Sequence, residues 1–172
     1  MAIESLSLLR KIIYGVLLAL VFFTGALAAG LLQGKVGVAL TLIGTSVVLE
    51  AQPAAALSIL LHFDPMSGAI ISILANLIAI PLLMLTFDEV ISRWKWLGRK
   101  LRKAEKWSIK YGKYGVWVLT PLTPFLGAYV CVSIGYLLRW PPIRIFVSIL
   151  CGVIVSTFLI TYGGHSILSW FR

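Results

Sequence analysis

The chain has 172 residues, of which 60% are hydrophobic and only 12% are charged. A soluble domain usually carries about 25% charged residues, and the longest polar stretch, residues 87–114, is too short for a soluble catalytic domain. The composition therefore excludes a soluble globular protein. It predicts one all-α integral membrane domain over residues 1–172.

Five apolar segments follow one another along the chain, separated by short polar or proline-containing turns. Each approaches or exceeds the roughly 20 residues that a membrane-crossing helix needs. The first is long for the apolar region of a cleaved signal peptide, so we interpret it as an uncleaved transmembrane helix. The segments cover residues 12–32, 36–61, 66–87, 116–138 and 143–162.

A basic linker, residues 88–114, separates the third and fourth segments. Nine of the fifteen lysines and arginines lie between Arg93 and Lys113. Apolar residues recur there at three- and four-residue steps, which predicts an amphipathic helix on the membrane surface or, equally, a solvated connector helix. Such clusters stay in the cytoplasm and attract anionic lipid headgroups. Nucleic acid is not an expected partner.

Two of the segments are broken by proline: residues 36–61 by Pro53, and residues 116–138 by Pro121 and Pro124. Proline lacks the donor that the helix ladder needs. Each segment is therefore either a kinked full span or a re-entrant hairpin. Hairpins place nearly all the basic residues on one side of the membrane, which fits the positive-inside rule better. We therefore predict a plasma-membrane protein with its N-terminus and basic linker in the cytoplasm.

This topology makes the two halves inverted copies, each a re-entrant helical hairpin followed by a transmembrane helix, with an extra N-terminal transmembrane helix. Pro65 and Pro141 are each followed seven residues later by Ser-Ile-Leu, beginning at Ser72 and Ser148. The interval is 76 residues in both cases. Chance similarity between apolar helices is the alternative, but weak internal symmetry is typical of transporters.

Glu50 is the most informative candidate for a binding residue. It follows 14 apolar residues, and an ionisable group at membrane depth usually faces a cavity or a partner. One hypothesis is that it binds a coupling proton or a cationic substrate group. The other is that it is a structural carboxylate that accepts hydrogen bonds from backbone freed at a hairpin tip.

The other candidate substrate- or ion-binding residues lie at the two predicted tips and on the third segment. Half-helix ends and hydroxyl groups at such tips can hold ions through backbone dipoles. A buried asparagine bridges to a tip or makes an interhelical hydrogen bond. These residues are Gln52, Pro53, Asn76, Thr120, Pro121, Thr123, Pro124 and Tyr129.

Motifs of nucleotide hydrolysis and of intramembrane catalysis are missing from the sequence. It contains no GxxxxGK[ST] loop, no HExxH and no nucleophile elbow. We therefore expect neither an enzyme nor a cofactor, and no cysteine or histidine spacing indicates a metal site.

Short motifs at the same residues resemble a known family. Glu50-Ala51-Gln52-Pro53, Asp64-Pro65 and Asn76 to Pro81, with the later Tyr114-Gly115, Pro121, Pro124 and Gly127-Ala128, are similar to the putative small multidrug export proteins. That family is itself distantly similar to the DedA/VTT proteins, which are built from two inverted re-entrant hairpins, and some of which move lipids such as polyprenyl phosphates.

The DedA-type resemblance implies roles for three residues. Glu50 and Pro53 match the acidic, proline-containing first hairpin, and Pro121 matches the proline of the second. DedA proteins carry an arginine shortly after that second proline, whereas residues 122–138 contain no arginine or lysine. A lipid phosphate would lose that partner here.

Three functions remain open at the level of sequence. The leading prediction is an ion-coupled secondary transporter or exporter of small molecules, with its site between two hairpin tips, possible proton coupling and possible homodimerisation. The alternatives are a DedA-like lipid translocase or scramblase and a non-transporting membrane scaffold. A transporter predicts a polar cavity containing Glu50, a lipid translocase predicts a lateral opening, and a scaffold predicts tightly packed tips with Glu50 fully hydrogen-bonded.

Overall fold

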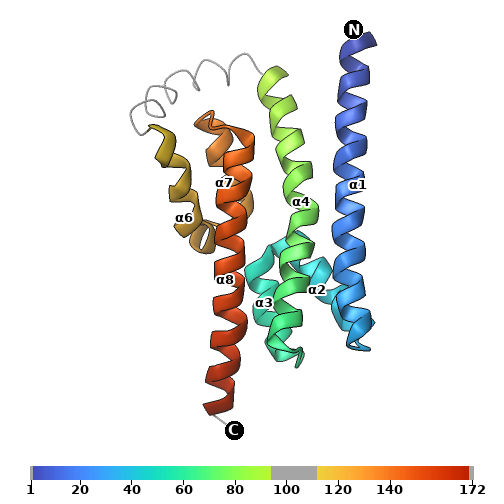
Figure 1. Cartoon of the computed structure of the whole chain (residues 1–172), viewed down its shortest axis with the longest axis vertical. Helices are drawn as coiled ribbons and strands as arrows, with labels where there is room; N and C mark the ends of the chain where they lie inside the picture. The colour runs from blue at the N-terminus through green and yellow to red at the C-terminus, as the bar shows by residue number, and fades with distance from the viewer. Residues whose placement is uncertain (1, 94–111, 171–172) are drawn as a thin grey trace.

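The computed structural model describes residues 2–93 and 112–170, so most of the predicted basic linker lies outside the described residues. Within these described residues, three helices are long and apolar enough to cross a membrane, as the sequence predicted. They are α1 (Ala2–Leu32), α4 (Pro65–Arg93) and α8 (Pro142–Trp170). The chain runs down α1, up α4 and down α8, and its two termini lie at opposite ends of the molecule (Figure 1).

Small residues let the long helices approach one another. A side chain at Gly15 of α1 would meet Leu85 of α4 at 2.7 Å, and one at Gly25 would meet Leu74 at 3.5 Å. These contacts lie more than two helical turns apart, so α1 follows α4 over much of its length (Figure 1). Much of the remaining surface of α1 presents exposed leucine, isoleucine and valine side chains, which suits a helix that faces lipid.

Two pairs of short helices complete the described chain. The first pair is α2 (Val36–Leu49) and α3 (Ala51–Leu60). The second is α6 (Leu119–Leu126), which continues the 3₁₀ turn η1 (Gly112–Val118), and α7 (Ala128–Leu137). Helices of 8 to 14 residues are about 12–21 Å long, which is less than the roughly 30 Å hydrocarbon core of a bilayer.

The two short-helix pairs lie at opposite ends of the long helices. Figure 1 shows α2 and α3 beside the lower part of α4, and α6 and α7 beside the upper part of α8. The loops before α2 and after α3 both lie at the lower end, and η1 and the loop after α7 both lie at the upper end. Each pair therefore starts and finishes at the same end of the molecule.

The prolines do not mark the breaks, contrary to what the sequence predicted. The breaks fall at Glu50 and Gly127, the single residues between paired helices. Pro53 and Pro121 are each the third residue of a helix, a position in the first turn where no backbone donor is needed. Pro124 lies inside α6, three residues before the break. The chain turns where the backbone has positive φ, and proline cannot adopt that conformation.

Corresponding elements of the two halves are separated by 77 residues. This interval relates Glu50 to Gly127 and the helix start Pro65 to Pro142. It also relates His62 (φ 55°) to Arg139 (φ 54°), the positive-φ residues that follow α3 and α7.

The sequence comparison aligned Pro65 with Pro141, at an interval of 76 residues, and therefore differs by one residue from the interval between the helix starts. Pro141 precedes α8 and caps it, since its carbonyl accepts from the backbone N–H groups of Arg144 and Ile145. Asp64 is its counterpart before α4. It accepts from the N–H of Gly68 through its carbonyl and from the N–H of Ser67 through its side chain, at 3.2 Å, and thereby caps the start of α4.

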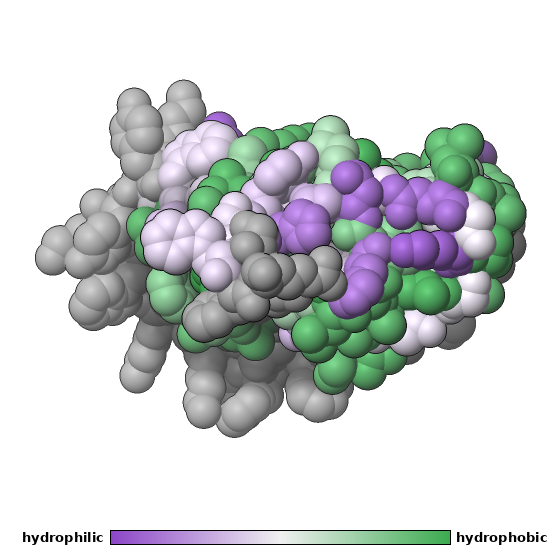
Figure 2. Space-filling model, turned by 90° about the horizontal axis from the view of Figure 1, so that it is seen from below, coloured by the Kyte–Doolittle hydropathy of each residue, from purple (hydrophilic) through white to green (hydrophobic). Residues whose placement is uncertain are grey.

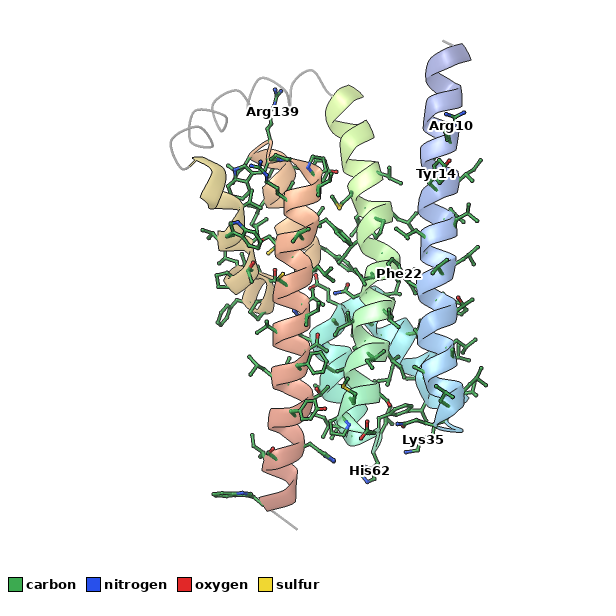
Figure 3. The ribbon with its side chains drawn as sticks, in the orientation of Figure 1. Arg10, Tyr14, Phe22, Lys35, His62 and Arg139 are labelled. Atoms are coloured by element: carbon green, nitrogen blue, oxygen red, sulfur yellow. The ribbon has the colours of Figure 1, made fainter. Side chains whose placement is uncertain are left out.

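Polar contacts gather at the lower end of the molecule. Lys35 Nζ donates to the carbonyl of His62 at 2.7 Å and lies over the ring of Phe63, and Gln33 donates to Ser67 at 2.7 Å. Seen from below, hydrophilic side chains form a band bordered by apolar surface (Figure 2). Figure 3 places Lys35 and His62 at this end, and Arg10 and Arg139 at the other.

Candidate functional site

Both breaks adopt the same unusual backbone conformation. Glu50 has φ 76° and ψ 175°, and Gly127 has φ 86° and ψ 157°. This region is essentially restricted to glycine, and any other residue held there is strained by about 1–3 kcal/mol. We call the break at Glu50, between α2 and α3, the first junction, and the break at Gly127, between α6 and α7, the second junction. Glu50 persists in its strained conformation because the contacts around it stabilise the first junction. Backbone outliers of this kind are typical of functional positions.

The Glu50 carboxylate binds the N-terminus of α7, in the other half of the chain. Its Oε2 accepts from the backbone N–H of Ala128 at 2.7 Å, and its Oε1 accepts from that of Tyr129 at 3.2 Å. These N–H groups have no partner within the helix and carry the positive end of its dipole. A side chain at Gly127 would collide with the carboxylate, so the glycine leaves the space that Glu50 fills.

Tyr129 makes a second contact between the junctions, from α7 back to the end of α2. Its hydroxyl lies 2.7 Å from the carbonyl of Val47 and 3.4 Å from that of Ser46, both in the last turn of α2. Those carbonyls are the ones that a helix end leaves without an internal partner. The first half thus supplies an acceptor to α7, and the second half supplies a donor to α2.

Gln52 adds a third connection between the halves. Its Nε2 lies 3.3 Å from the carbonyl of Thr123 on α6 and 3.4 Å from Ser156 Oγ on α8. Both distances are at the long end for hydrogen bonds. The predicted residues Glu50, Gln52, Thr123 and Tyr129 therefore do come together, where the two junctions meet.

Other predicted residues lie apart from this meeting point. Thr120 Oγ1 contacts Ser148 on α8, at 3.0 Å to its carbonyl and 2.9 Å to its hydroxyl. Pro124 has no N–H to donate to the Thr120 carbonyl, and Gly152 of α8 packs closely against that carbonyl. Thr120 thus joins α6 to α8, and the side chains of Pro53 and Pro124 are exposed.

Pro121 is likewise exposed, in the first turn of α6. Asn76 is fully buried on α4, but neither atom of its amide has a hydrogen-bond partner in the described part of the chain. The expected interhelical hydrogen bond of Asn76 is therefore not formed in this conformation.

Sequence reasoning missed several residues of the junction. Gly127 is one, although a glycine that aligns with an acid at a matching break is a detectable pattern once the interval of 77 residues is known. Ser46 and Ser156 gave no signal, because single serines in apolar helices are common at helix contacts. The N–H group of Ala128 is a backbone group, which side-chain motifs cannot identify.

The features described so far define a class: a helical membrane protein in which two broken helix pairs from opposite ends meet through a half-buried carboxylate. Residues 50–159, more than half of the chain, match the family model described as "Putative small multi-drug export protein". The chain belongs to this family. The matched range begins at Glu50 and includes both junctions. No curated protein and no solved structure matches the chain significantly.

Proposed function

We propose that the chain is an ion-coupled secondary transporter that exports small molecules, with its site where the two junctions meet. Membership of a family described by export supports transport rather than catalysis. The observation that carries the proposal is the strained Glu50, whose carboxylate reaches across to the backbone N–H groups of Ala128 and Tyr129. A strained, ionisable residue that joins the two halves is suited to control their separation.

The proposed topology has α2–α3 and α6–α7 as re-entrant hairpins that enter the bilayer from opposite faces. Their lengths and their placement at opposite ends support this arrangement, as does their irregular backbone, which must be buried in protein or line a cavity. Arg10 and Arg139 share one end (Figure 3). By the positive-inside rule this end faces the cytoplasm of a plasma membrane, and the lysines and arginines of the linker sequence make anionic headgroups its proposed partners.

In the proposed mechanism the contact between Glu50 and α7 is a closed gate. A carboxylate that accepts two N–H bonds holds the halves together, and a proton on Glu50 weakens both bonds because the neutral acid is a poorer acceptor. The junctions then separate and the substrate enters between them. Tyr129 joins the two junctions twice, through its N–H to Glu50 and through its hydroxyl to the carbonyl of Val47, so the second bond breaks in the same movement.

A proteoliposome assay tests this function. Purified protein is reconstituted, and ethidium movement is followed with and without an imposed pH gradient, comparing wild type with Glu50→Gln. We expect movement that follows the gradient in wild type and loses that dependence in Glu50→Gln. Equal gradient dependence in both proteins would refute the coupling role, and no movement above protein-free liposomes would refute this export reaction.

A lipid translocase is the second candidate, and the exposure of apolar side chains beside the junctions favours it. Phe125 is 84% exposed and Leu49 is 59% exposed, and each is within two residues of a break. A half-buried Glu50 next to such a surface is open to a lipid chain from the side. Reduction of NBD-labelled phospholipid by external dithionite in the same liposomes separates the candidates, since a translocase exposes both leaflets.

A scaffold is the third candidate, and it is supported by the hydrogen bond that each oxygen of the Glu50 carboxylate accepts. A scaffold moves neither ethidium nor lipid. In that case Glu50→Gln would lower thermal stability without any change in ethidium or lipid movement. The transporter proposal requires the opposite result, a change in movement in protein that remains folded.

A further inference from the structure

Three buried polar side chains beside the junctions have no hydrogen-bond partner in the described chain. Ser72 and Asn76 on α4 and Thr157 on α8 are each 0% exposed. The hydroxyl groups of Ser72 and Thr157 and both polar atoms of the Asn76 amide lack a hydrogen-bond partner among the described residues. The large majority of buried polar side-chain atoms in proteins are hydrogen-bonded. Three exceptions of this kind therefore need a common explanation.

Ser72 and Asn76 lie against the first junction. The Ser72 carbonyl accepts from Ser46 Oγ at 2.7 Å, and Ser46 lies within reach of the Tyr129 hydroxyl. Asn76 follows Ser72 by four residues, so both side chains share one face of α4. The same face carries Ile73 and Ile80, which belong to the core cluster that contains Ala51 and Ala128, the first residues of α3 and α7.

Thr157 lies on α8, which also packs near the junctions. It follows Ser156, whose hydroxyl lies 3.4 Å from Gln52 Nε2. Gln52 is two residues from Glu50, and α8 packs against both α3 and α4. The unpaired groups on α4 and α8 therefore flank the place where the two halves meet.

The chemistry of Asn76 limits the class of ligand. Its amide offers two N–H donors and one carbonyl acceptor, and all of them are unpaired. A bare cation would pair with the oxygen and leave the N–H groups unpaired, and an anion would do the reverse. A group that both donates and accepts, such as an amide or a hydroxyl, pairs with both, and Ser72 and Thr157 can each do the same.

We propose that Asn76, with Ser72 and Thr157, recognises an uncharged hydrogen-bonding group, such as an amide, on the molecule that enters the site. This inference rests on the proposed transport function and names the chemistry that the site accepts. The buried groups remain unpaired when the junctions are closed. They find partners when such a group lies between α4 and α8.

Asn76→Leu tests the proposal, because leucine has the same branched arrangement of four side-chain heavy atoms and no polar atoms. Thermal unfolding of the detergent-purified full chain is measured alone and with acetamide, acetate or methylammonium as small probes. We expect Asn76→Leu to be at least as stable as wild type, since an unpaired buried amide destabilises the closed conformation. We also expect it to lose the stabilisation by acetamide that wild type shows, while acetate and methylammonium act equally on both proteins.

A matched pair on α8 controls for general effects of removing a hydroxyl. Thr157→Val removes an unpaired group, whereas Thr161→Val removes a buried hydroxyl that donates to the carbonyl of Thr157 at 3.0 Å. We expect Thr157→Val to keep its stability and weaken the acetamide response, and Thr161→Val to lose some stability and keep that response.

Two results would overturn the inference. One is a clear loss of stability in Asn76→Leu, which means that the amide is hydrogen-bonded in the folded protein. The other is an equal acetamide response in wild type and Asn76→Leu, which includes the case in which the amide binds buried water only. Coupled ethidium movement that persists in wild type with either result leaves the proposed function intact. Its absence from wild type removes the proposed function instead.

Discussion

The two helix junctions have the same backbone turn but opposite chemistry. At the first, Glu50 provides a carboxylate that extends away from its own helices. At the second, Gly127 has no side chain and leaves space for that carboxylate. The backbone N–H groups of the next two residues donate hydrogen bonds to it. No side chain of the described residues caps the N-terminus of α3, whereas Glu50 satisfies that of α7. An architecture with two matching breaks thus holds one asymmetric contact, and the asymmetry determines which junction can respond to a proton.

The largest expected effect comes from filling the space at the second junction. Gly127→Ala places a Cβ against the Glu50 carboxylate in a backbone conformation that alanine strongly disfavours. We expect a loss of about 2–4 kcal/mol in the free energy of unfolding, measured by thermal unfolding in detergent. Gly37→Ala is the control, because a Cβ added at Gly37 would meet no atom within 4 Å. Equal stability of the two variants would contradict the close contact.

The first junction allows backbone strain to be separated from hydrogen bonding. Glu50→Ala and Glu50→Gly both remove the carboxylate, but only glycine relieves the positive φ of 76°. We expect the glycine variant to be the more stable of the two by about 1–3 kcal/mol, the reverse of the order found inside an ordinary helix. Chemical denaturation followed by tryptophan fluorescence measures the difference. If alanine were the more stable, the assigned conformation of residue 50 would be wrong.

A smaller effect is expected at the return contact. Tyr129→Phe removes the hydroxyl that donates to the carbonyl of Val47 at 2.7 Å and keeps the ring. One lost hydrogen bond predicts about 0.5–1.5 kcal/mol of destabilisation, again by denaturation. If the junctions form the gate, this variant also opens more readily, so ethidium moves faster at the same gradient. Unchanged stability together with unchanged movement would remove Tyr129 from the contact.

The smallest expected effect belongs to Gln52. Its two contacts, at 3.3 and 3.4 Å, are long, and the side chain is partly exposed. Gln52→Met should change the free energy of unfolding by less than about 0.5 kcal/mol. Stability close to that of wild type fits this view, whereas a loss as large as that of Tyr129→Phe would mean that Gln52 carries a stronger connection between the halves.

Much of the fold could be predicted from the sequence. Hydropathy and length identify the three long helices, because a helix in lipid must bury its backbone polar groups within itself. The segments that contain the short helix pairs were also found. Their exact breaks were not, because proline is a strong local signal whereas the positive φ of Glu50 depends on contacts with the other half of the chain.

The candidate site was predicted less completely than the fold. Glu50 was identified because a lone acid in an apolar run is conspicuous, and Tyr129 because it lies in the matching segment. Their direct connection depends on backbone N–H and carbonyl groups, which every residue possesses and no motif reports. The unpaired state of Asn76 is likewise a property of packing, since the sequence indicates only that the residue is buried.

The central claim, that the two helix pairs enter the membrane from opposite faces, is tested most directly by labelling the loops that follow them. Single cysteines replace His62 or Arg139 in a background without Cys131 and Cys151, and intact cells are treated with a membrane-impermeant maleimide. We predict that position 62 is labelled from outside and that position 139 is labelled only after the cells are opened. Labelling of both positions from the same side would mean that residues 116–138 cross the membrane as a full span, and would contradict the account.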